Sequence, residues 1–128
     1  MPPMRISVRA GQPASRVRAI ADAAHQALIE TIDAPPDDRF QIVTEHAGNG
    51  LIYDRHFLGI ERSDDIVMIQ ITLRRGRAVT RKQALYRRLA ERLHDAAGVR
   101  PQDVFVSLVE NDLSDWSFGD GVAQYVKE

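Results

Sequence analysis

The hydrophobic pattern of the first half of the chain changes its period twice. Apolar and polar residues alternate over 5–9, which predicts a strand, and three- and four-residue spacings over about 14–32 predict a helix. Pro35 and Pro36 end that helix, and the run at 40–44 indicates a second strand. The apolar positions of the helix are Val17, Ile20, Ala24, Ala27, Leu28 and Ile32.

The second half repeats this order of elements. The β-branched run at 66–73 predicts a central strand, and the run at 104–109 predicts a closing strand. Between them, Thr80 followed by Gln83 is typical of a capping box at a helix start, and Gly98 is placed to end that helix. The predicted helix buries the face that carries Leu85, Leu89 and Leu93.

The two halves together predict one α+β domain over 1–128. It consists of a β-α-β unit (about 4–45), a connector (about 46–65), a second β-α-β unit (about 66–110) and an aromatic tail (111–128). Right-handed crossovers would place both helices on one face of a four-stranded sheet, giving two layers.

Neither face of this sheet is predicted to be fully polar. One run supplies Ile69, Ile71 and Leu73, while Phe105 and Val109 lie in another strand. Because helices cover only one face, an apolar bare face in so small a chain favours oligomerisation.

Composition narrows the function classes. The 128 residues carry a net charge of −1, contain no cysteine, and are 44% hydrophobic and 27% charged. Nothing in this balance indicates nucleic acid or a membrane as a partner, and no apolar run is long enough to span a bilayer. A small cytoplasmic protein is the expectation, because the absence of cysteine fits a reducing compartment.

The histidines do not form a metal motif. His46 and His56 have no second ligand at metal-binding spacing, and His25 and His94 lie in the predicted helices. A serine-nucleophile elbow is also missing from the sequence. We therefore expect neither a metal nor another cofactor, which leaves unassisted acid/base chemistry.

Pro2 offers such chemistry without using a side chain. If Met1 is removed, Pro2 carries a free secondary amine on a stiff ring beside the first predicted strand. An α-amino group titrates at about 7.7–8.0, where burial and neighbouring charges can tune it. The alternative is a proline pair that only stiffens a loose chain end.

Three guanidiniums follow the central strand in the loop 74–77. Arg74, Arg75 and Arg77 could bind a carboxylate through bidentate hydrogen bonds. The alternative is a solvated basic loop paired with Asp64 or Asp65.

Two further segments could contribute to a site. Asp38, which precedes a strand, could orient water or tune an amine, although an aspartate after two prolines is also ordinary turn chemistry. Trp116 and Phe118 lie in a polar tail with Tyr125 nearby, where aromatic side chains pack on a pocket wall, a neighbouring subunit or their own domain.

Several segments carry a resemblance to a known family. They are the Met-Pro start and residues 37–43, 58–63, 71–73 with 76–77, 85–86 with 90–93, and 115–119 with 123–125. In this order and spacing, which span nearly the whole chain, the segments resemble the tautomerase superfamily, in its malonate semialdehyde decarboxylase-like branch.

The resemblance implies the doubled β-α-β fold, assembly as a homotrimer, and sites near subunit borders. It implies that Pro2 is the acid/base and that Asp38 positions water or the proline. It further implies that Arg77, with either Arg75 or Arg74, binds the substrate carboxylate.

Trp116 and Phe118 match an apolar wall over the family's site. The expected activity is keto–enol tautomerisation of a small oxo acid, with decarboxylation of a malonate-semialdehyde-like 3-oxo acid as a close second. The alternatives are a carboxylate-binding protein that retains Met1, and a hydratase or dehalogenase of 3-haloacrylates. Pro3 bears on this choice, because a proline after the newly exposed residue hinders methionine removal.

Overall fold

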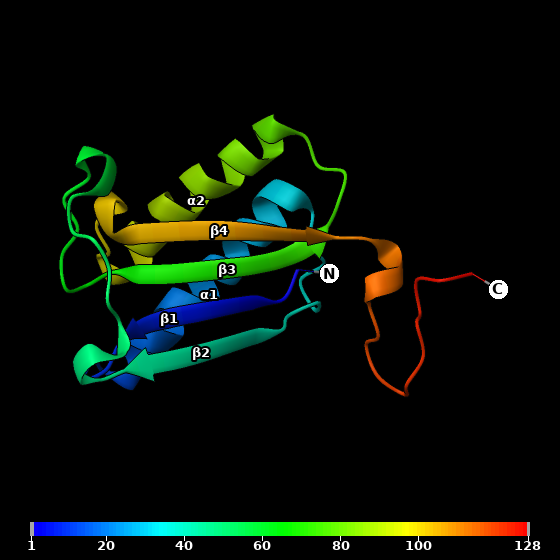
Figure 1. The fold of residues 1–128 in the computed structure, drawn as a ribbon, viewed down its shortest axis with the longest axis horizontal. Coiled ribbons are helices and arrows are strands. Elements are labelled where there is room, and N and C mark those ends of the chain that lie inside the picture. The colour runs from blue at the N-terminus through cyan, green and yellow to red at the C-terminus, as the bar shows by residue number, and fades with distance from the viewer. Residues whose placement is uncertain (1, 128) are drawn as a thin grey trace.

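The computed structural model describes residues 2–127, and Met1 and Glu128 lie outside the described residues. Four strands and two long helices follow one another as a strand, a helix and a strand, twice (Figure 1). Their bounds are β1 Met4–Arg9, α1 Ala14–Ile32, β2 Gln41–His46, β3 Val67–Arg74, α2 Val79–Ala97 and β4 Val104–Asn111.

The four strands form one sheet in the order β2-β1-β3-β4. Within each half the two strands are parallel, while the central pair β1 and β3 is antiparallel. Both helices lie behind the same face of this sheet in Figure 1. The predicted two-layer fold is therefore confirmed.

The core fills the space between the sheet and the helices. Alternate residues of the strands point to the helices because side chains of a strand change face at every step. Small alanines on α1 and a leucine stripe on α2 meet them. The fully or nearly fully buried residues include Ile6, Val8, Ala24, Leu28, Ile69, Ile71, Leu73, Leu85, Leu89 and Leu93.

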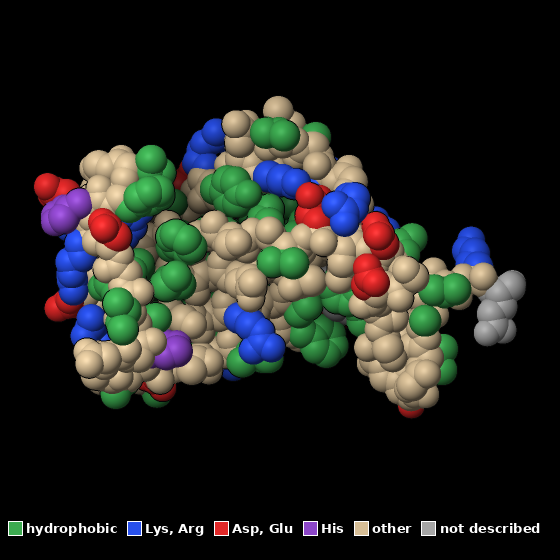
Figure 2. All heavy atoms as spheres, viewed as in Figure 1, with side chains coloured by type: hydrophobic (Ala, Val, Ile, Leu, Met, Phe, Trp, Pro, Cys, Tyr) green, Lys and Arg blue, Asp and Glu red, His purple; other side chains and the backbone are tan. Residues whose placement is uncertain are grey.

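The other face of the sheet is bare and partly apolar. Ile42, Phe105 and Val109 keep 53%, 42% and 41% of their surface exposed on it. Figure 2 views the molecule from this side, and hydrophobic side chains lie between charged ones. The prediction that neither face is fully polar is confirmed.

The start of α2 differs from the sequence prediction. Ala78, in an extended conformation, is the N-cap, and no side chain caps the helix. The predicted capping box is wrong because Thr80 already lies inside the first helical turn, where its hydroxyl cannot act as an N-cap. At the other end Gly98 adopts the left-handed conformation with φ 68°, as predicted.

Candidate active site

The sheet topology brings three distant segments to one end of the sheet. Met4 of β1 pairs with Gln41 of β2 in parallel and with Ile71 of β3 in antiparallel. The residues just before β1 and β2 therefore lie beside the loop that follows β3. In sequence terms, Pro2, Asp38 and the arginine loop meet there.

Backbone hydrogen bonds fix the segment that carries Pro2. The amide of Thr72 donates to the Pro3 carbonyl at 3.1 Å, and the amide of Met4 donates to the Phe40 carbonyl at 3.0 Å. Pro2 itself is buried. Since the sheet continues almost to the chain start, Pro2 is held in position, which excludes the loose-end alternative for this residue.

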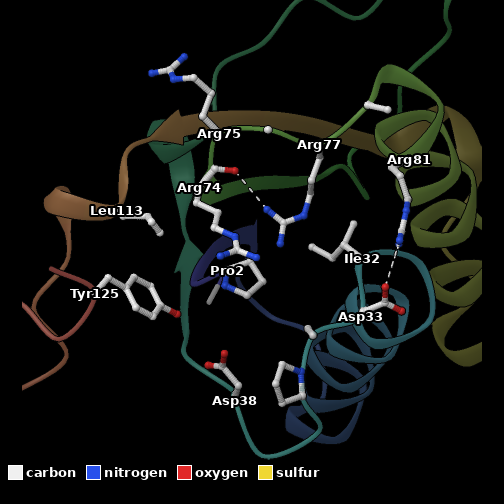
Figure 3. A pocket seen from close by; sticks show the side chains of 14 residues that line it. Pro2, Ile32, Asp33, Asp38, Arg74, Arg75, Arg77, Arg81, Leu113 and Tyr125 are labelled. Carbon is white, nitrogen blue, oxygen red and sulfur yellow. Dashed lines mark hydrogen bonds and ion pairs between the residues drawn. The ribbon is translucent and has the colours of Figure 1, made fainter. Parts of the chain in front are cut away.

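A cavity of about 750 Å³ opens at this end of the sheet (Figure 3). Its volume suits a small organic ligand. The residues that line it are Pro2, Ile32, Asp33, Ala34, Pro35, Asp38, Arg74, Arg75, Gly76, Arg77, Ala78, Arg81, Leu113 and Tyr125.

Two of the three loop arginines point over Pro2 in Figure 3, namely Arg74 and Arg77. Arg77 is half-buried, and its Nη1 donates to the Arg74 carbonyl at 3.1 Å. Gly76 allows this turn, because its φ of 122° is one that residues with a Cβ rarely adopt.

Arg75 takes a different direction. Its amide donates to the Asn111 carbonyl at 2.7 Å, and its Nε donates to Oδ1 of Asp112 at 3.3 Å. Figure 3 shows its guanidinium turned away from Pro2. Of the two candidates for the second arginine, Arg74 is therefore the one that points into the cavity.

The acidic partners suggested for a solvated loop are engaged elsewhere. Asp65 forms an ion pair with Arg16 at 2.7 Å, and Asp64 pairs with Arg9 at 3.4 Å and with Arg55. The alternative in which the arginine loop pairs with these aspartates does not hold, because they lie at the opposite end of β3 and pair with Arg9, Arg16 and Arg55.

The cavity concentrates positive charge around Arg77. Burial lowers the pKa of Arg77, and the neighbouring cations Arg74 and Arg81 lower it further. Arginine stays protonated at any working pH, so burial and the neighbouring cations make this an unfavourable environment for the charge that Arg77 carries. A bound carboxylate would relieve that cost by supplying the opposite charge.

Asp38 faces the arginines from the other side of Pro2 (Figure 3). Its amide donates to the Pro35 carbonyl at 3.0 Å, which closes a turn after α1. The side chain is half-buried and lines the cavity, whereas Asp37 beside it is exposed. The turn after Pro35 and Pro36 thus directs the Asp38 side chain toward the cavity. Asp38 can therefore be a turn residue and a candidate site residue at once.

The aromatic tail reaches the cavity through Tyr125. Trp116 and Phe118 stack with ring centroids 5.5 Å apart, and Tyr125 contacts Phe118 edge-on at 4.9 Å. Among the described residues that line the cavity, Tyr125 is present, but Trp116 and Phe118 are not. Trp116 instead lines an adjacent hollow of about 540 Å³ with Phe40 and Ile42.

Sequence reasoning missed several cavity residues. Asp33 and Arg81 bring an additional charge pair, and Leu113 and Tyr125 close the side toward the tail. Arg77 precedes α2, whose N-cap is Ala78, while Arg81 lies in the first turn of this helix, so helical spacing gave no signal that would join the two arginines.

The described residues show neither a metal cluster nor a membrane segment. Residues 2–127 contain no group of three or more His, Asp or Glu side chains arranged to hold a metal ion. Over the same residues, neither α1 nor α2 has the length and apolarity that crossing a membrane requires.

The fold and the cavity define a class: a small α+β protein with a proline facing arginines at one end of its sheet. Two family models, both described as tautomerase enzyme, match residues 38–119 and 2–56. The probable tautomerase YusQ of Bacillus subtilis (strain 168) is 39% identical over 127 residues, covering 99% of this chain and 100% of that protein. The chain belongs to the tautomerase family.

Solved structures identify the branch of the family. FG41 malonate semialdehyde decarboxylase inhibited by 3-bromopropiolate is 40% identical, with a TM-score of 0.89 over 95% of this chain and 92% of that one. Another malonate semialdehyde decarboxylase, with decarboxylase and hydratase activities, is 32% identical, with a TM-score of 0.88 over 95% and 94%.

A symmetric trimer of fused 4-OT shares the fold alone, at 22% identity and a TM-score of 0.77 over 94% of each chain. The likeness at higher identity places this tautomerase-family enzyme in the malonate semialdehyde decarboxylase-like branch.

Proposed function

We propose that this protein is a cofactor-free acid/base enzyme acting on small oxo acids, with the amine of Pro2 as its acid/base. Its main activity is keto–enol tautomerisation, and decarboxylation of a malonate-semialdehyde-like 3-oxo acid is a close second. The observation that carries the proposal is Pro2, buried in a cavity beneath Arg74 and Arg77 and opposite Asp38 (Figure 3).

The arginines bind the substrate carboxylate. Their guanidiniums match a carboxylate geometrically and keep their charge throughout the cycle. With the carboxylate held, the adjacent carbonyl or enol carbon lies over Pro2. The neutral amine then takes a proton from one position of the substrate and returns it to another, which interconverts enol and ketone.

Decarboxylation uses the same residues with the amine protonated. The bond between the carboxylate carbon and C2 breaks, and carbon dioxide leaves. The electron pair of the broken bond moves through C2 to the C3 carbonyl oxygen. The Pro2 ammonium stabilises the enolate that forms, which lowers the barrier. Protonation of C2 completes the reaction and converts malonate semialdehyde to acetaldehyde.

The balance of charges decides which form of the amine predominates. Arg74 and Arg77 disfavour the protonated amine, whereas Asp38 favours it and orients water or the proline. Both activities thus draw on one cavity, at different protonation states of Pro2.

Mass spectrometry and turnover test this proposal together. Intact mass first identifies the fraction of purified chains that begin at Pro2, because Met1 would make its nitrogen a non-ionisable imide. Ketonisation of phenylenolpyruvate and formation of acetaldehyde from malonate semialdehyde are then measured. Turnover of at least one substrate is expected. A sample with a confirmed Pro2 terminus that turns over neither would contradict the proposal.

A carboxylate-binding protein without catalysis is the second candidate, and the arginine pair favours it because binding does not require the Pro2 amine. Such a protein would retain Met1 in its native cells, and its carboxylate ligand would remain unchanged. The same intact-mass measurement separates the two candidates.

We further propose that the chain assembles as a homotrimer. Support comes from the apolar bare face of the sheet and from the trimeric fused 4-OT that shares the fold. Light scattering coupled to size-exclusion chromatography should give three times the monomer mass, and a monomer at micromolar concentration would contradict this.

A further inference from the structure

An ion pair closes one side of the candidate cavity. Arg81, in the first turns of α2, donates to the Thr31 carbonyl at 2.7 Å and to Oδ2 of Asp33 at 3.1 Å and 3.2 Å. Asp33 caps the end of α1 with a left-handed φ of 58°. Because Asp33 and Arg81 both line the cavity that contains Pro2, this pair ties two helix ends together at its rim (Figure 3).

The charges around the cavity are arranged asymmetrically. Arg74 and Arg77 point over Pro2, while the carboxylates of Asp33 and Asp38 lie on the opposite side (Figure 3). The charges of Arg81 and Asp33 also act on Arg77. Arg81 lowers the pKa of Arg77, and Asp33 raises it. The far end of a ligand held by Arg74 and Arg77 would thus share the cavity with the Asp33–Arg81 pair, in which the Arg81 cation is already paired and the Asp33 side chain is 78% exposed.

We propose that Asp33 and Arg81 form a specificity-determining pair that selects ligands with a single carboxylate and an uncharged far end. Asp33 repels a second carboxylate, and it also occupies Arg81, the guanidinium that would otherwise bind one. Selectivity of this kind combines attraction for one ligand with repulsion of another. The inference deepens the proposed function by naming its substrate class.

The size of the effect follows from the exposure of the pair. The side chains of Arg81 and Asp33 are 50% and 78% exposed. Charge pairs in such surroundings are weak and are screened by salt. We therefore expect a discrimination of about fivefold, largest at low ionic strength.

Binding of two matched acids tests the proposal without requiring turnover. Crotonate and fumarate share a four-carbon chain with a trans double bond, and fumarate has a carboxylate where crotonate has a methyl group. Calorimetric titration of wild type should show preference for crotonate. In Asp33→Asn, the fumarate-to-crotonate affinity ratio should rise about fivefold, because Arg81 becomes available to the second carboxylate.

Asp37→Asn is the matched control. It removes the same charge four residues away, but Asp37 is exposed and absent from the described cavity lining. Asparagine tolerates the left-handed conformation of position 33, so Asp33→Asn should fold, and thermal unfolding verifies this. The double variant D33N/R81Q should give a lower ratio than Asp33→Asn, because no guanidinium remains at position 81 to bind the second carboxylate.

Three outcomes would overturn the proposal. The first is an equal ratio in Asp33→Asn and Asp37→Asn, and the second is a ratio in D33N/R81Q as high as that in Asp33→Asn. The third is failure of every variant to bind either acid. Because these readouts are affinities, they stay distinct from the turnover measurements: an enzyme without turnover can still show the selectivity, and an active enzyme can lack it.

Discussion

At the scale of single residues, the site depends on the direction in which each side chain points and not only on the residue type. Arg74 and Arg75 are adjacent and chemically identical, yet one points into the cavity and the other pairs with Asp112. The difference arises because the backbone amide of Arg75 still donates to the Asn111 carbonyl, which continues the hydrogen bonding between β3 and β4. The same loop thus provides a candidate carboxylate-binding residue, Arg74, and a control residue of the same type, Arg75.

Substituting the loop arginines should separate these positions. Arg77→Gln or Arg74→Gln should lower kcat/KM by about 10- to 100-fold, because each removes charge-assisted hydrogen bonds to the carboxylate. Arg75→Gln makes the same charge change outside that contact and should alter kcat/KM by less than about threefold. Equal losses in all three variants would show that the net charge of the loop matters and its geometry does not.

We expect Pro3 to set the fraction of chains from which Met1 is removed. Pro3→Ala should increase the fraction of chains that begin at Pro2, because alanine removes the proline that hinders cleavage of Met1. The carbonyl that accepts from Thr72 is retained, so the position of Pro2 should be kept. Intact mass measures the fraction, and Pro101→Ala, outside the described lining of the cavity that contains Pro2, serves as control. An unchanged fraction in Pro3→Ala would contradict this role.

At the scale of elements, strand ends and helix ends place the chemistry. Parallel pairing of β1 with β2 aligns their starts, and antiparallel pairing of β1 with β3 brings the end of β3 to the same place. Polar ties then hold the neighbouring segments. Arg39, just before β2, donates to Oδ1 of Asp22 on α1 at 2.7 Å and to the side chain of Gln41 at 2.9 Å.

The tie between Arg39 and Asp22 predicts a pH dependence of stability. The hydrogen bond from Arg39 holds the pKa of Asp22 below its ordinary value. A carboxyl with a lowered pKa in the folded state stabilises the fold above its unfolded pKa of about 3.9, and this contribution is lost as the pH falls through the folded value.

Urea unfolding measures that contribution. The free energy of unfolding of Asp22→Asn should be lower than that of wild type at pH 7, and the difference should disappear as the pH falls below the pKa that Asp22 has in the folded state. The effect is small because Asp22 is half exposed. A difference that does not change with pH would contradict an electrostatic origin.

At the scale of the whole molecule, the bare sheet face has the character of an interface. It exposes Ile42, Phe105 and Val109 while the opposite face is covered by α1 and α2 (Figures 1 and 2). Apolar area that remains exposed in a monomer can be buried by a neighbouring copy, and closed symmetry satisfies every such face.

A charge on that face should therefore disrupt assembly. Phe105→Glu should shift the mass measured by light scattering from the trimer toward the monomer, because the glutamate would lose its hydration in the interface. Ala96→Glu, on an exposed position of α2 in the helical layer, should leave the mass unchanged. A trimeric Phe105→Glu would place the interface elsewhere.

Much of the local structure could be predicted from residue patterns. Alternation and helical spacing indicated every strand and both long helices, because burial on one face requires those periods. The start of α2 was misplaced, since Thr80 has the chemistry of a cap but the helix already begins at Val79, with Ala78 as its N-cap. Residue chemistry and position offered Pro2, Asp38 and Arg77 as candidates, the resemblance assigned their roles, and these three residues line one cavity.

What the sequence alone determined is the order of elements, the presence of an apolar bare face and the residue types available for acid/base chemistry. The tertiary structure decided which of those residues meet. Asp33 and Arg81 are 48 residues apart in sequence. They become partners only because the end of α1 lies beside the start of α2 in the folded structure. Tyr125 lines the cavity in place of Trp116 and Phe118 because the tail folds back on its own ring stack. Periodicity reports the face on which a residue lies, but the direction of a loop side chain depends on contacts that form only after the sheet is assembled.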